Sequence, residues 1–120
     1  MGCDIHAWVQ YRVKGASSDD SWQDWSGEMH WDRWYALFGR MAGLRDPDVE
    51  AIVEPRGVPG GFWSVDIIED GYHTPSWLTL EEFATVAAEY PCPDVDATLA
   101  AMRSLEANGQ EVRIVFAFDS

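Results

Sequence analysis

Lysine is almost missing from this chain. Lys14 is the only one, beside seven arginines, and the eight basic residues face 21 acidic ones for a formal net charge of −13. Binding to nucleic acid or to an anionic bilayer needs a positive field, so we expect neither activity. A strong excess of arginine over lysine is typical of planar, bidentate recognition of phosphate or carboxylate, although a GC-rich gene gives the same bias.

Long hydrophobic runs are missing too. No apolar segment approaches the 18 or so residues of a membrane span, so we expect no membrane association. The first residues do not resemble a signal peptide, because Asp4 and His6 stand where a basic and then an apolar leader would be. The two cysteines, Cys3 and Cys92, have no nearby Cys or His at zinc-finger spacing, and we expect them to be reduced. These features favour a cytoplasmic protein.

The length and composition predict a single domain over residues 1–120. A chain of 120 residues with 47% hydrophobic and 13% aromatic residues is long enough for one modest core. The charge is unevenly spread, since residues 1–45 hold six acids and five bases, whereas residues 46–110 hold thirteen acids and only Arg56 and Arg103 as bases. An anionic ligand should therefore favour the N-terminal half.

The segment 3–13 alternates as a strand does. Side chains two residues apart lie on the same side of a strand, so Asp4 and His6 should stand side by side. Trp8, Gln10 and Arg12 share that face, and the opposite face is apolar. One side of this strand therefore predicts core, and the other predicts either a site or an ordinary polar sheet face.

The remaining elements predict an α+β fold. We expect a helix over 33–41 capped by Asp32 and ended by Gly43, a second over 79–90 that begins with a capping box, and a third that Asp94 caps and Asn108-Gly109 closes. Strands are expected over 62–68 and 111–118, the latter inside the sheet and bringing Asp119 close to Asp4. The expected architecture is a small antiparallel or mixed sheet with two to three helices on one face and the long loops 15–31, 46–61 and 69–78 on the other.

Several segments resemble one known family. They are MGCDIHAWVQYR at the start, RWYALF and AGLR over 33–45, PRGVP over 55–59, DGYHTPSWLT over 70–79 and VRIVFAFD over 112–119. With these segments the chain resembles a family of small bacteriophage and bacterial proteins that share the N-terminal MGCDIH signature. Members usually have a small polar residue after the glycine equivalent to Gly71, where this chain has Tyr72 followed by His73. The resemblance implies a phage accessory protein in the cytoplasm of the bacterial host and brings little chemistry with it.

The leading functional hypothesis is a pocket that binds a small anionic ligand of nucleotide type. Aromatic rings can stack on a base, arginines can pair with phosphate, and the loop 57–61 can offer backbone N–H groups to an anion. For a phage accessory protein, such a pocket would sequester a host immune signal. The candidate ligand-binding residues are Asp4, His6, Trp8, Arg33, Tyr35, Arg45, Arg56, His73, Ser76 and Trp77.

Three alternatives stay open. A metal-dependent hydrolase could use Asp4 and His6 with further ligands from His30, Asp66, His73 or Asp119. Nucleophilic catalysis at Ser76 with His73 or His6 as base is less favoured, because no Gly-x-Ser-x-Gly elbow is present. The acidic stretch 46–110 could also imitate nucleic acid and inhibit a host enzyme, although such charge usually lies on solvated helix faces. The sequence indicates no particular cofactor and does not decide whether identical copies assemble.

Overall fold

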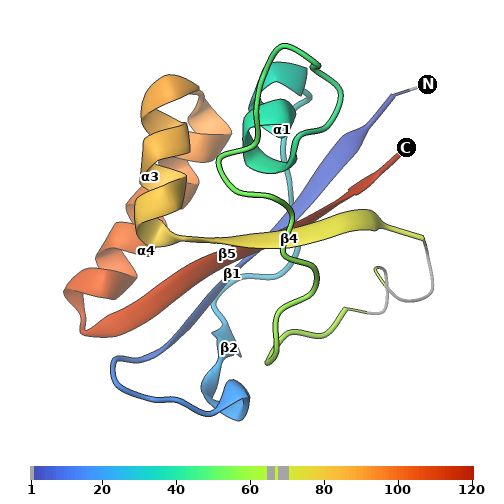
Figure 1. Ribbon diagram of the computed structural model, residues 1–120. Coiled ribbons are helices and arrows are strands. Elements are labelled where there is room, and N and C mark those ends of the chain that lie inside the picture. Colours follow the sequence, from blue (N-terminus) through green and yellow to red (C-terminus); the bar gives the residue numbers. More distant parts are fainter. Residues whose placement is uncertain (1, 65–66, 68–70) are drawn as a thin grey trace.

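The computed structural model describes residues 2–64, 67 and 71–120. In this part of the chain, one antiparallel sheet of five strands carries three helices on one side, which confirms the α+β class (Figure 1). The strand order is β2-β1-β5-β4, and β3 also pairs with β1. The strands are β1 Asp4–Val13, β2 Gln23–Asp24, β3 Met29–His30, β4 His73–Thr79 and β5 Gln110–Asp119. The helices are the 3-10 turn η1 Asp19–Ser21 and the α-helices α1 Tyr35–Ala42, α3 Leu80–Glu89 and α4 Pro93–Ala107.

The two longest strands, β1 and β5, form the middle of the sheet. They pair antiparallel along their whole length, from Asp4 opposite Asp119 to Val13 opposite Gln110. Their alternation is as the sequence predicts, because the side chains directed at the helices are apolar and buried. This core includes Ile5, Ala7, Val9, Ile114, Phe116 and Phe118. The other face of the same strands, here called the lower face, is left for polar and aromatic side chains.

Helix α3 confirms the capping box. The Thr79 hydroxyl accepts a hydrogen bond from Glu82 N at 3.2 Å, and the Glu82 carboxylate accepts one from Thr79 N at 2.9 Å. Both bonds satisfy donors that a helix start otherwise leaves unpaired. None of the helices in the described part of the chain is long and apolar enough to cross a membrane.

The starts of the other two helices differ from the prediction. Helix α1 begins after Trp34, which is 38% exposed and not on the buried face, and Asp32 does not cap it. Instead Asp32 N donates to the Asp94 carboxylate at 3.0 Å. That carboxylate lies in the first turn of α4, whose N-cap is Cys92, because Pro93 takes the first helical position that proline favours. The predicted ends at Gly43 and at Asn108-Gly109 are confirmed.

Several extended segments also differ from the prediction, and the first is the expected loop 15–31, which contains the short strands β2 and β3 because both pair with β1. Residues 73–76 were expected to be loop but belong to β4, an edge strand in which Pro75 is tolerated and which bulges between His73 and Ser76. Thr74 in this bulge has φ 52°, which is uncommon for a β-branched residue. The strand expected over 62–68 is irregular at 62–64, and most of its remainder lies outside the described residues.

The long loop 46–61 serves both faces of the sheet. Its first part packs beside α1, where Ile52 N donates to Arg40 O at 2.7 Å and Ile52 and Val53 join the main core. It then crosses the edge strand β4, where Gly57 N donates to Pro75 O at 3.0 Å, and reaches the lower face (Figure 1). Only the second half of this loop therefore covers the side expected to carry the site.

Candidate ligand-binding site

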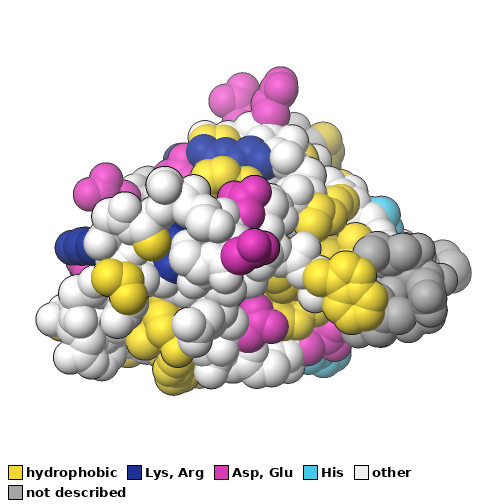
Figure 2. Space-filling view, turned by 90° about the horizontal axis from the view of Figure 1, so that it is seen from below, with side chains coloured by type: hydrophobic (Ala, Val, Ile, Leu, Met, Phe, Trp, Pro, Cys, Tyr) yellow, Lys and Arg dark blue, Asp and Glu magenta, His cyan; other side chains and the backbone are white. Residues whose placement is uncertain are grey.

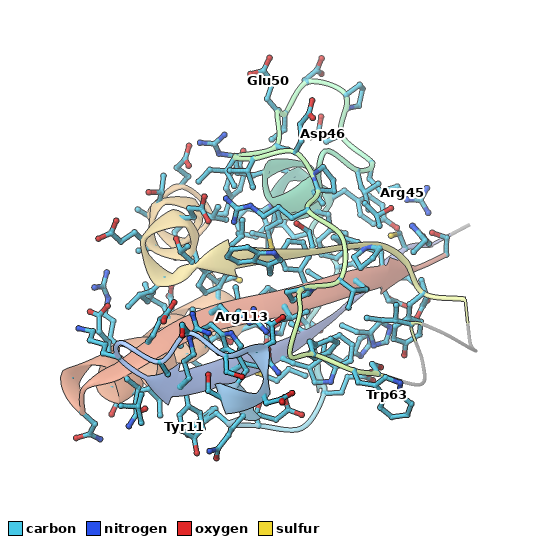
Figure 3. The ribbon with its side chains drawn as sticks, turned by 60° about the horizontal axis from the view of Figure 1, so that its bottom comes forward. Tyr11, Arg45, Asp46, Glu50, Trp63 and Arg113 are labelled. Atoms are coloured by element: carbon cyan, nitrogen blue, oxygen red, sulfur yellow. The ribbon has the colours of Figure 1, made fainter. Side chains whose placement is uncertain are left out.

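A row of polar side chains crosses the middle of the lower face. The register places Asp24 of β2 opposite Gln10 of β1, Gln10 opposite Arg113 of β5, and Arg113 opposite Thr79 of β4. Directly paired residues point to the same face of a sheet, so the strand register itself brings these groups together. Arg113 therefore lies over the centre of the sheet, as Figure 3 shows.

Arg113 is the central group of this row. It is only 6% exposed, and its Nε and Nη2 donate to Gln10 Oε1 at 2.9 and 2.7 Å, while Nη2 also donates to Gly60 O at 2.8 Å. Burial, together with the nearby cation Arg12, lowers the pKa of Arg113 to about 10. The guanidinium is therefore still charged at neutral pH, although its surroundings disfavour the charge.

The acceptors around this cation are neutral. No carboxylate of the described residues lies within ion-pair distance of Arg113. Asp19, Glu111 and Asp24 raise its pKa only from farther away. Its Nη1 forms no hydrogen bond with the described residues. A buried charge without a paired counter-charge is costly, and such groups are concentrated at functional sites.

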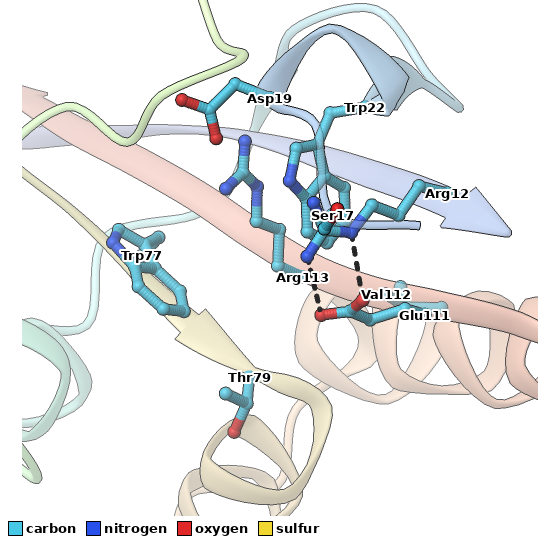
Figure 4. Close-up of a pocket in the computed structure, with 9 residues that line it drawn as sticks. All are labelled: Arg12, Ser17, Asp19, Trp22, Trp77, Thr79, Glu111, Val112 and Arg113. Atoms are coloured by element: carbon cyan, nitrogen blue, oxygen red, sulfur yellow. Dashed lines mark hydrogen bonds and ion pairs between the residues drawn. The ribbon is translucent and has the colours of Figure 1, made fainter. Parts of the chain in front are cut away.

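Arginine and tryptophan side chains alternate around this group. The guanidinium carbons of Arg113 and Arg12 lie 3.9 and 4.4 Å from the centre of the Trp22 ring. In Figure 4 the Trp22 ring stands between the two guanidinium groups. Farther along, Arg113 is 6.0 Å from the Trp77 ring, the outer limit of a cation–π contact, and Arg56 covers Trp77 at 4.4 Å.

A cavity of about 190 Å³ opens between these side chains. Its lining comes from β1, from η1 and its flanks, from β4 and from β5 (Figure 4). The residues are Arg12, Ser17, Asp19, Trp22, Trp77, Thr79, Glu111, Val112 and Arg113. From below, the surface shows basic side chains next to hydrophobic ones, with acidic side chains around them (Figure 2). We call this cavity the Arg113 pocket.

Two glycines allow the pocket to close on its outer side. A Cβ at Gly60 would lie 2.2 Å from the Asp19 carboxylate, and one at Gly61 would lie 2.3 Å from the Asp19 carbonyl. Gly61 also has φ +85°. At position 61 only glycine fits, because the chain passes directly against the backbone of the η1 turn, whereas a side chain at position 60 would displace the Asp19 carboxylate. The loop presents the carbonyls of Gly60 and Gly61 to Arg113 and Gln10, not the N–H groups that the sequence suggested.

Some of the predicted site residues meet at the end of the sheet where Asp4 pairs with Asp119. Asp4 accepts from Arg33 Nε at 2.7 Å, and this hydrogen bond holds the pKa of Asp4 below its usual value. His6 bonds Asp119 through Nε2, while its Nδ1 lies 3.3 Å from Glu28 Oε2. The rings of His30 and Tyr72 stack on His6 with centres 5.2 and 4.2 Å away.

His6 is thus only 8% exposed and fully engaged. It lies under the rings of His30 and Tyr72 and is paired with Asp119 and Glu28, so the described residues around it enclose the imidazole. Its two nitrogens point to carboxylates on opposite sides. Among the described residues, no three His, Cys, Asp or Glu side chains form a group that could hold a metal ion. Asp66, offered as a further ligand, lies outside the described residues.

The other predicted residues are scattered. His73 bonds the Thr74 and Ser120 hydroxyls at 2.9 and 2.8 Å. Tyr35 accepts from Cys3 N at 3.2 Å, and Arg45 lies 5.3 Å over the Tyr35 ring, beside α1 and far from Arg113 (Figure 3).

Two of them are buried. Ser76 is fully buried and accepts from Arg56 N at 3.0 Å, so it holds the loop in place and does not line the surface. Trp8, a candidate for stacking on a ligand, is only 6% exposed and packs edge-on against Phe62. Of the ten candidates, only Trp77 lines the Arg113 pocket, with Arg56 behind it.

The sequence reasoning missed the central residues Gln10, Trp22 and Arg113. The signal was present, since Arg113 falls on the non-core face of the last strand and Gln10 on the same face of the first strand. Only the register of the two strands shows that they are neighbours. Comparison with protein-family models, curated proteins and solved structures finds no match to this chain.

Proposed function

We propose that this protein binds a small anionic ligand of nucleotide type in the Arg113 pocket. One observation carries the proposal: a buried guanidinium, charged at neutral pH and without a carboxylate partner among the described residues, lines a cavity between two indole rings. An anion in the cavity would supply the missing counter-charge. Charge-assisted hydrogen bonds from arginine to phosphate are about twice as strong as neutral ones, so phosphate fits this role.

Each wall of the pocket has a distinct part in this proposal. Nη1 of Arg113 donates to the phosphate, while Arg12, which is paired with Glu111 at 2.9 Å, contributes mainly its positive field. Trp77 is half-buried and bordered by the cavity, and it offers a ring face to a base or sugar. At about 190 Å³ the cavity encloses a phosphate with part of its nucleoside, so a larger ligand would project into solvent.

The biological role proposed for such binding is sequestration. The resemblance to phage proteins supports an accessory protein that acts in the bacterial host and removes a nucleotide-derived immune signal from solution. A sequestering protein needs affinity and no turnover, and the proposed ligand contacts are of that kind. The signal would be released unchanged when the protein unfolds, whereas an enzyme would release a product.

Isothermal titration calorimetry tests the proposal directly. The panel comprises AMP, ADP-ribose derivatives and cyclic dinucleotides. We expect heat with at least one of them, and a loss of about 1–3 kcal/mol of binding free energy in Trp77→Ala if the base stacks on this ring. Trp63→Ala is the matched control, because Trp63 is 70% exposed and lies away from Arg113 (Figure 3). Absence of heat with every ligand at micromolar protein would refute the proposed function.

A further inference from the structure

We infer that Gln10 is the specificity-determining residue that keeps the Arg113 pocket selective for anions. This inference rests on the proposed function and assigns a part in it to a side chain that does not line the cavity. Gln10 accepts two hydrogen bonds from Arg113 and thereby fixes the guanidinium without neutralising it. The positive charge stays available to a ligand.

The orientation of the Gln10 amide is dictated by its neighbours. A guanidinium has only donors and a carboxylate only acceptors, so Oε1 must face Arg113 and Nε2 must face Asp24. Both contacts are formed, the second at 2.9 Å, and Nε2 also donates to Gly61 O at 3.1 Å. Gln10 is 2% exposed, so water does not compete for these positions.

The amide also separates two opposite charges. Asp24 and Arg113 flank Gln10 on the two neighbouring strands, and a direct pair between them would satisfy both. With Gln10 between them, the carboxylate of Asp24 influences Arg113 only from a distance. A glutamate at position 10 would have the same length and would form the ion pair that the ligand is proposed to form. The difference between amide and carboxylate at this position thus decides whether the pocket presents a net positive group.

The decisive variant is the double substitution Gln10→Glu with Asp24→Asn. It moves one carboxylate from β2 to β1, leaves the net charge unchanged, and keeps a hydrogen bond between the two positions. The matched control Asp24→Asn alone removes the distant carboxylate and keeps Gln10. Arg113→Gln removes the guanidinium itself. Gln10→Glu alone offers the same comparison should the double variant fail to fold by circular dichroism.

The measurement is the change in Tm with inorganic phosphate, from zero to about 50 mM at constant ionic strength, because a ligand that binds only the folded state raises Tm. We expect a rise in the wild type and in Asp24→Asn beyond the general effect of phosphate on proteins, which Arg113→Gln reports. The double variant should respond like Arg113→Gln, and its phosphate affinity should fall about tenfold or more, or about 1.4 kcal/mol. The double variant also loses the hydrogen bond from position 10 to Gly61 O, which lowers its Tm without phosphate but does not change the rise in Tm that phosphate causes.

Two results would overturn the inference. One is an equal phosphate response in the wild type and in the double variant, which would show that the charge at position 10 is irrelevant. The other is a wild-type response no larger than that of Arg113→Gln. Either result together with nucleotide heat in calorimetry would leave the proposed function standing. In a third outcome, phosphate raises the Tm of the wild type but not of the double variant, and no nucleotide gives heat in calorimetry. This outcome would support the inferred role of Gln10 in an anion site and refute a nucleotide as the ligand.

Discussion

At the scale of single residues, the ion pair between Arg56 and Glu82 makes stability depend on pH. The hydrogen bonds from Arg56, at 2.7 Å each, hold the pKa of Glu82 below its usual value. A carboxyl whose pKa is lower in the folded state adds stability above its unfolded pKa, and this contribution is lost as the pH falls through the folded value. The pair also fixes the loop that crosses β4.

We therefore expect Glu82→Gln to cost about 1 kcal/mol at pH 7 and progressively less as the pH falls through the folded pKa of Glu82. Glutamine preserves the capping box, so the ion pair is the main interaction that is lost. Urea unfolding at pH 7 and at a series of acidic pH values measures this. Glu81→Gln in the same helical turn is the control, because both variants lose the same interaction with the helix dipole. Equal losses for the two variants at pH 7 would show that the Arg56 ion pair contributes nothing.

Backbone conformation at single glycines gives a second prediction. Gly57 and Gly61 have φ +80° and +85°, but a Cβ at Gly57 meets nothing within 4 Å, whereas one at Gly61 meets the Asp19 carbonyl at 2.3 Å. Gly57→Ala should cost about 1 kcal/mol from the left-handed conformation alone. Gly61→Ala should cost at least about 2 kcal/mol, because the loop must also move. Chemical denaturation of both variants checks this, and similar losses would contradict the close approach of loop and turn.

At the scale of elements, the start of α3 is held by its N-cap. Thr79→Ala removes the acceptor of the Glu82 N–H and should lower the free energy of unfolding by about 1 kcal/mol. Thr85→Ala, in the middle of the same helix, removes only a bond to the Glu81 carbonyl and should be nearly neutral. Thermal unfolding of both variants separates a capping effect from a general effect of losing a hydroxyl. A larger loss for Thr85→Ala would refute this assignment.

The same scale shows which features could be predicted. The strand 3–13, the capping box at Thr79 and the glycine stops depend on contacts within a few residues, and the sequence pattern contains them. The start of α1 depends on Asp32 meeting Asp94, and β4 depends on pairing of His73 and Ser76 with β5. Local patterns do not contain such long-range contacts.

The residues of the Arg113 pocket could not be predicted from the sequence for a related reason. Asp4 and His6 share a strand face as expected, yet Glu28, His30 and Tyr72 arrive from elsewhere and cover the imidazole. Gln10 and Arg113 are 103 residues apart and become neighbours only through the β1–β5 register. A residue type can thus be chosen from the sequence for its chemistry, whereas its accessibility is a property of the assembled sheet.

At the scale of the whole molecule, the two faces of the sheet do different work. The upper face and its three helices supply the apolar core, with Phe38, Phe83 and Phe116 fully buried. The lower face carries the cluster around Trp8 and Phe62 between two polar regions, the His6 region and the Arg113 pocket. Because the same two strands provide both faces, a packing change in the core would move Gln10 and Arg113 together. The position of the pocket is therefore fixed by β1 and β5, the two central strands of the fold.

The excess of acidic residues should make stability depend on salt. With a net charge of −13, repulsion among carboxylates destabilises the compact state, and added salt screens it. We expect Tm to rise as NaCl increases from about 20 to 200 mM.

Glu106→Lys, at an exposed position in the last part of α4, changes the net charge from −13 to −11 by removing one acid and adding one base. It should raise Tm at low salt, because it reduces the repulsion and places a cation in the last turn of the helix, where the helix dipole favours one. It should also flatten the dependence of Tm on salt, because less repulsion is left for salt to screen. Differential scanning calorimetry measures both slopes. A wild-type Tm that falls with NaCl would mean that ion pairs such as Arg33 with Asp4 outweigh the general repulsion.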